Sequence, residues 1–181
     1  VANVINNSAT FVALFLFSRL ATPDEFGLVT LYVSFSMTLS FMLDFGTGVS
    51  LVRSYNTACD ESARSLILAS AFAFRAATSI LVIVALFLIY SFDTVADKVD
   101  AHPLAVVSIA ACAISLSWWA GLRSLLQADH DYKKYSRITI GMSVIRLVIV
   151  ALFFYGETYA AVYYLLGLYC LAPAIMAGIG L

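Results

Sequence analysis

Charged residues are scarce in this chain, and it has no polar stretch long enough to form a separate water-soluble domain. Of the 181 residues only 12% are charged, whereas 62% are hydrophobic, and the mean hydropathy is +0.96. A typical soluble domain is about half apolar and about a quarter charged. The composition therefore predicts a membrane protein. Because the formal net charge is only −1, nucleic acid is not expected as a partner.

The residues that metal sites, disulfide frameworks and most active sites require are also few. The three cysteines, Cys59, Cys112 and Cys170, have no paired spacing, and His102 and His130 have no ligand-like neighbours. The sequence contains no glycine-rich phosphate loop, no His-Glu-x-x-His and no Gly-x-Ser-x-Gly. We therefore expect no metal, no cofactor and no catalytic residue.

Six apolar stretches of about twenty residues make up most of the chain. About twenty helical residues, each rising ~1.5 Å, match the ~30 Å hydrocarbon core of a bilayer. The sequence therefore predicts an all-α polytopic membrane protein, a bundle of six transmembrane helices. A break is expected at Asp44–Gly48, with polar residues continuing to about Ser65. The expected spans are approximately 1–20, 23–43, 66–92, 104–126, 138–155 and 159–181.

The break after the first span carries the signal of a helix start. Thr22 can cap the next helix, Pro23 suits the first helical position, and Glu25 lies three residues after the cap. This spacing is typical of a capping box, in which the two side chains satisfy each other's backbone N–H groups. The second helix is therefore expected to begin at Pro23.

Basic residues fall mainly in alternate breaks between the spans. With a cytoplasmic N-terminus, the outer breaks contain only Arg19 and Lys98. This distribution follows the positive-inside rule, so we expect both chain ends in the cytoplasm. The basic residues on the inner side would be Arg53, Arg64, Arg123, Lys133, Lys134 and Arg137.

Two arginines, Arg75 and Arg146, lie inside predicted spans. A charged side chain deep in a bilayer costs at least ~2.5 kcal/mol on insertion scales, so such residues usually face a cavity or a partner. Both are expected at a similar depth, ~12–14 Å from the cytoplasmic side, where two guanidinium groups can hold a pyrophosphate. The alternative is that each arginine snorkels to the near headgroups or pairs with a carboxylate such as Asp44.

Polar side chains of the first and second spans are further candidates. Asn3, Asn7 and Thr10 fall on one helical face, close to the expected level of the two arginines. They either line the same vestibule and contact sugars, or bond between helices for packing alone. Asp44, near the membrane edge, is a candidate for ion coupling, although a helix-end carboxylate in the interface has the same pattern.

The stretch from Ser18 to Leu28, followed by Asp44-Phe45-Gly46 and then an arginine, resembles the N-terminal region of the polysaccharide biosynthesis membrane proteins. These include the O-antigen and lipid-linked oligosaccharide flippases. The first hairpin of that family typically reads Ala-Arg-Leu-Leu-Gly-Pro-Glu-Glu-Tyr-Gly, with Asp-Leu-Gly and an arginine further on. Ser18 and Thr22 here replace small residues, and Phe26 replaces tyrosine. The motif residues, for which structural roles are expected, are Arg19, Pro23, Glu25, Gly27, Gly46 and Arg53.

The resemblance implies the multidrug/oligosaccharidyl-lipid/polysaccharide exporter superfamily, whose members have two six-helix bundles around a cavity that alternates access. The chain begins without methionine and ends in an apolar run, so we expect it to be a piece of a longer protein. The resemblance implies that residues 1–181 are the N-terminal lobe, with the C-terminal lobe missing. The implied activity is flipping of a polyprenyl-diphosphate-linked oligosaccharide across the inner (cytoplasmic) membrane, for surface glycans such as lipopolysaccharide.

The implied role is transport rather than enzymatic catalysis. The implied partners are membrane lipid, the lipid-linked oligosaccharide, the missing lobe and other polysaccharide assembly enzymes. Two alternatives stay open. One is a multidrug-type exporter. The other is a membrane-embedded polymerase or ligase, which usually carries a large outer loop that these six spans lack.

Overall fold

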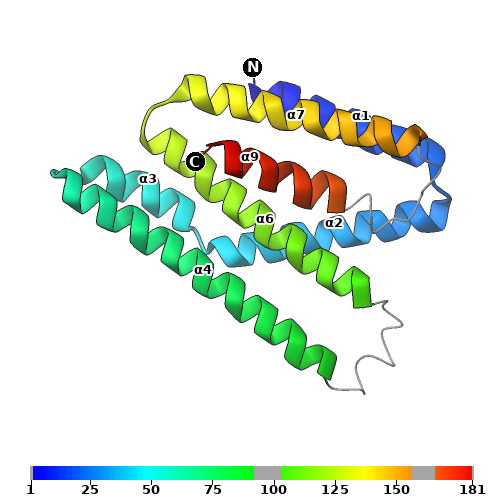
Figure 1. The fold of residues 1–181 in the computed structure, drawn as a ribbon, viewed down its shortest axis with the longest axis horizontal. Helices are drawn as coiled ribbons and strands as arrows, with labels where there is room; N and C mark the ends of the chain where they lie inside the picture. Colours follow the sequence, from blue (N-terminus) through cyan, green and yellow to red (C-terminus); the bar gives the residue numbers. More distant parts are fainter. Residues whose placement is uncertain (1, 92–102, 156–165, 181) are drawn as a thin grey trace.

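The computed structural model describes residues 2–91, 103–155 and 166–180, and its secondary structure in these ranges is entirely helical (Figure 1). The prediction of an all-α fold is confirmed. The elements are α1 (Ala2–Leu20), α2 (Pro23–Asp44), α3 (Thr47–Thr57), α4 (Glu61–Ser91), α6 (Pro103–Ala128), α7 (Tyr132–Tyr155), the π-helix η1 (Leu166–Leu171) and α9 (Ala172–Gly180).

Within the described residues, four helical segments are long and apolar enough to cross a membrane, judged by length and composition. Large apolar side chains are exposed on their outer surfaces, which suits contact with lipid chains. α1 is a helix over the first expected span, and part of the sixth expected span lies outside the described residues. The count of six spans stays a prediction. The four segments are Pro23–Thr57, Glu61–Ala85, Val106–Ala128 and Tyr132–Leu152.

The capping box expected at the start of α2 is present. The Glu25 carboxylate accepts the Thr22 backbone N–H at 2.9 Å, and the Thr22 hydroxyl accepts the Glu25 backbone N–H at 3.4 Å. Pro23 occupies the first helical turn, where its missing N–H has no cost. The turn that joins α1 to α2 is therefore fixed by local chemistry.

The break expected after α2 is short, and most of the polar stretch that follows it is helical. Phe45 and Gly46 both adopt left-handed backbone conformations, with φ of 42° and 73°. α3 then begins at Thr47, and α4 begins at Glu61 rather than at residue 66. Hydropathy marks only the part of a helix that suits hydrocarbon, and here the helices continue beyond it through polar residues.

Helix α6 lies at the centre of the bundle, where it packs against α2, α3, α4, α7, η1 and α9. α1 packs along α7 instead (Figure 1). α1 and α2 therefore meet at their capped turn and diverge away from it (Figure 1). The α1–α7 pair is thus separated from the α2–α6 pair, and η1 and α9 pack against both α6 and α7 (Figure 1).

Candidate functional site

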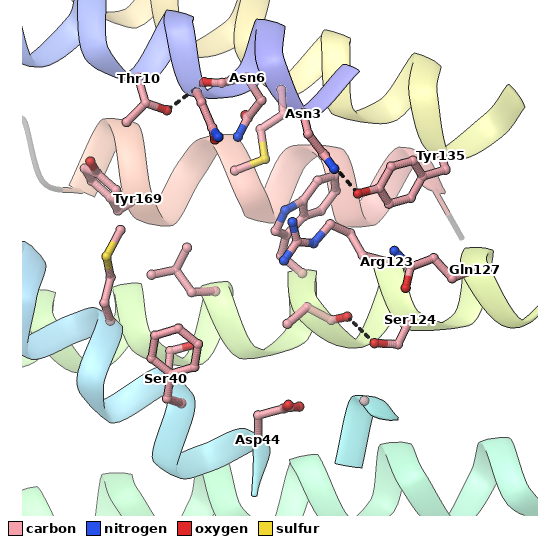
Figure 2. Close-up of a pocket in the computed structure, with 18 of the residues that line it drawn as sticks. Asn3, Asn6, Thr10, Ser40, Asp44, Arg123, Ser124, Gln127, Tyr135 and Tyr169 are labelled. Carbon is pink, nitrogen blue, oxygen red and sulfur yellow. Dashed lines mark hydrogen bonds between the residues drawn. The ribbon is translucent and has the colours of Figure 1, made fainter. Parts of the chain in front are cut away.

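A cavity of approximately 1140 Å³ lies between these two helix pairs. Its volume slightly exceeds the ~300–1,000 Å³ that is usual for small-molecule sites, so it suits a ligand larger than a single sugar. Figure 2 shows polar side chains that reach it from both walls: Asn3, Asn6 and Thr10 of α1 and Tyr135 of α7 on one side, and Ser40 and Asp44 of α2 and Arg123, Ser124 and Gln127 of α6 on the other.

The α1 wall carries the polar stripe that the sequence indicated. Asn3, Asn7 and Thr10 all line the cavity, and Asn6 joins them from the adjacent position on the same helix. The Asn3 side-chain oxygen accepts a hydrogen bond from the Tyr135 hydroxyl at 3.0 Å. The wall therefore presents amide and hydroxyl groups, which can donate to and accept from the hydroxyls of a sugar.

Arg146 of α7 lies behind this stripe and is only 6% exposed. Its Nη1 donates to the Thr10 hydroxyl at 2.9 Å and to the Asn6 side-chain oxygen at 3.5 Å. Its Cζ lies 5.4 Å from the centre of the Tyr169 ring of η1, a cation–π contact. Among the described residues, its Nε has no hydrogen-bond partner. Arg146 is thus a fixed cation at the cavity wall, with its Nε buried.

Arg75 of α4 has a different environment from Arg146. It is 1% exposed and forms an ion pair with Asp44 at the end of α2. Its Nη1 donates to the Ser117 carbonyl oxygen at 2.5 Å and to the Ser117 hydroxyl at 3.2 Å. The pairing with Asp44, one of the two alternatives left open by the sequence, is what the structure contains. Asp44 lines the cavity, and Arg75 lies behind it.

Arg123 of α6 is a cavity residue that the sequence reasoning missed. It had been counted only among the positive charges of the inner breaks. Its guanidinium extends from α6 into the space between the walls (Figure 2), and its Nε has no hydrogen-bond partner among the described residues. Arg146 lines the same cavity from α7. The four-residue spacing of Trp119, Arg123 and Gln127, which puts them on one helical face, was the available signal.

The cavity has an excess of positive charge. Its charged lining residues, among those described, are three arginines and a single carboxylate, Asp44. Because Asp44 is paired with Arg75, the arginine charges are left without a matching anion. An anionic ligand therefore fits this cavity better than a cationic one. The three lining arginines are Arg53, Arg123 and Arg146.

Most residues of the first-hairpin motif lie at the two ends of α2, and their contacts are local. The Arg19 guanidinium lies over the Phe15 ring at 5.3 Å, and a side chain at Gly27 would meet only open space. Gly46 occupies the left-handed position between α2 and α3. Arg53 differs from the others, because it lines the cavity from α3.

A comparison with known protein families decides the identity of the chain. All of residues 1–181 match the family described as polysaccharide biosynthesis protein. The chain belongs to this family. Family membership confirms the resemblance read from the first hairpin, and members of the polysaccharide biosynthesis family are generally transporters. No curated protein and no solved structure matched the chain.

Proposed function

We propose that this chain takes part in flipping a lipid-diphosphate-linked oligosaccharide across the inner membrane by alternating access, for assembly of a surface polysaccharide such as O-antigen. The family supports an exporter role in polysaccharide biosynthesis. The observation that carries the proposal is the pairing, in one cavity, of an arginine-rich zone with a wall of asparagine side chains. A diphosphate headgroup joined to a glycan requires both kinds of surface.

In this proposal Arg123 and Arg146 hold the diphosphate. Guanidinium groups donate paired N–H bonds that match the geometry of phosphate oxygens, and both residues line the cavity. Asn3 and Asn7 bind the first sugars, since their amides can both donate and accept. Arg123 replaces Arg75 as the second phosphate ligand expected from the sequence.

We further propose that the cavity opens toward the cytoplasm and that both chain ends lie on that side. Asn3, Asp44, Arg123 and Tyr135 lie near the helix ends that the positive-inside rule assigns to the cytoplasm. A second lobe of the intact protein would enclose the open side of the cavity. Asp44, the only carboxylate among the described lining residues, is the candidate for ion coupling.

Transport of a fluorescent lipid-diphosphate oligosaccharide in vesicles, using the intact protein, tests the proposal. Each hydrogen bond to a charged group contributes about 1.5–3 kcal/mol, so Arg123→Gln and Arg146→Gln should each reduce transport about tenfold to hundredfold. Arg64→Gln is the matched control, because Arg64 is exposed, stacks on Tyr55 and does not line the cavity.

Rates are compared at equal amounts of monodisperse protein. Normal transport by the Arg123→Gln/Arg146→Gln double variant would contradict the proposal. Efflux of cationic drugs without any glycan transport would instead favour a multidrug-type exporter.

A further inference from the structure

Asp44 poses an electrostatic problem for a cavity that is to bind an anion. Its side chain is 24% exposed and lines the cavity, together with the arginines. A free carboxylate there would repel phosphate and would also attract the nearby guanidinium groups. At 4 Å two unit charges interact by about 1 kcal/mol even in bulk water, and by more near protein. Something must therefore restrain and neutralise this carboxylate.

Arg75 has the position and the restraint needed for that role. Its guanidinium bonds Asp44 of α2 on one side and Ser117 of α6 on the other, so three helices fix it. Gly121 gives it space, since a side chain at this position would come within 2.8 Å of Nε. The Thr47 hydroxyl donates to the same Asp44 oxygen at 3.0 Å. With these contacts and 1% exposure, Arg75 cannot reach a ligand in the cavity.

We infer that Arg75 is a positioning residue that acts on the ligand only through Asp44. It cancels the charge of the cavity's carboxylate and holds that carboxylate against α4 and α6, away from Arg123 and Arg146. The cavity thereby keeps the positive potential of its arginines. The identity of the ligand as a diphosphate rests on the proposed function, whereas the charge compensation by Arg75 does not.

The cavity potential can be measured without any substrate. Ser40 lines the cavity one helical turn before Asp44, ~6 Å along the axis, so Ser40→Cys places a thiol beside the carboxylate. In a Cys59→Ser background, the thiol is modified by a negatively charged and by a positively charged methanethiosulfonate reagent. The ratio of the two rates reports the local potential. Compensation of Asp44 by Arg75 is read from whether removing both charges returns this ratio to the parental value.

Arg75→Gln should lower the anion-to-cation rate ratio about threefold to tenfold, because it leaves an unpaired carboxylate near the probe. Arg75→Gln/Asp44→Asn should restore the ratio to within about twofold of the parent, since the pair is again neutral. Asp44→Asn alone should raise it. Arg64→Gln removes a positive charge that lies outside the cavity lining, so it should leave the rate ratio unchanged.

A ratio that Arg75→Gln leaves unchanged, or that the double variant fails to restore, would overturn the inference. If Arg75→Gln does not fold, Asp44→Asn and the double variant decide, because the inference requires a higher ratio in the first and a parental ratio in the second. Transport is measured on the same proteins. The double variant could restore the rate ratio while the parent protein does not flip lipid diphosphate. That result would refute the proposed function and leave the inference standing.

Discussion

Gly121 of α6 lies directly against the buried guanidinium of Arg75. A methyl group added there would lie 2.8 Å from Nε and 3.0 Å from Cζ, and the guanidinium cannot move aside without losing Asp44 and Ser117. Gly121→Ala should therefore destabilise the intact protein by about 1–3 kcal/mol, although alanine is the better helix former by ~1 kcal/mol. Thermal unfolding in detergent measures the difference.

Gly141→Ala in α7 is the matched control for Gly121→Ala, because it adds the same methyl group to a helical glycine. Its added methyl would meet Met176 Cε at 2.9 Å, the far end of a flexible side chain that can rotate away. Gly141→Ala should change stability by less than ~1 kcal/mol in either direction. Equal losses for the two alanine variants would mean that the guanidinium of Arg75 is not held in place.

The sequence could predict the roles of some arginines better than others, as a comparison of Arg75, Arg146 and Arg123 shows. Arg75 and Arg146 were identifiable because a cation inside an apolar run is costly. Asp44 could also be named as a carboxylate partner, and Arg75 pairs with it. The partner of Arg146 could not be identified, because the hydroxyl that Arg146 contacts belongs to Thr10, 136 residues away, and only the packing of α1 on α7 brings them together. Arg123 lies near a helix end, where a positive charge also has a topological explanation, so its role in the cavity was missed.

At the scale of elements, short-range chemistry was predictable and long-range packing was not. Four residues, Thr22-Pro23-Asp24-Glu25, predicted the start of α2, because a capping box depends only on local spacing. α3 was not predicted. It is an eleven-residue helix whose buried side, at Gly48 and Leu51, is covered by α6, and so short a helix gains its stability from packing rather than from propensity.

The capping box allows a test of stability that is separate from transport. Glu25→Ala removes the acceptor of the Thr22 backbone N–H and should lower the free energy of unfolding by about 0.5–2 kcal/mol. Asp24→Ala, in the same helical turn but outside the box, should cost only ~0.3–1 kcal/mol. Transport per folded molecule should stay at the parental level for both variants. A selective loss of transport in folded Glu25→Ala protein would show that this carboxylate acts on the ligand.

At the scale of the whole molecule, the orientation in the membrane can be tested with a native residue. Cys59 lies exposed between α3 and α4, whereas Cys112 is buried and Cys170 is half-buried. If the proposed orientation is correct, a membrane-impermeant maleimide should label Cys59 in inside-out vesicles and not in right-side-out vesicles. Cys59→Ser should abolish the labelling. Labelling in right-side-out vesicles alone would reverse the proposed topology.

The packing of α1 on α7 also sets an order of events during biosynthesis. Asp44 and Arg75 are 31 residues apart and are both synthesised before α6, so their charges can enter the membrane already paired. Asn6 and Thr10, in contrast, leave the ribosome 136 or more residues ahead of Arg146. At ~5–20 residues per second this interval is on the order of ten seconds. During that time the polar face of α1 lacks its final partner, so the insertion machinery must hold the first helix until α7 arrives.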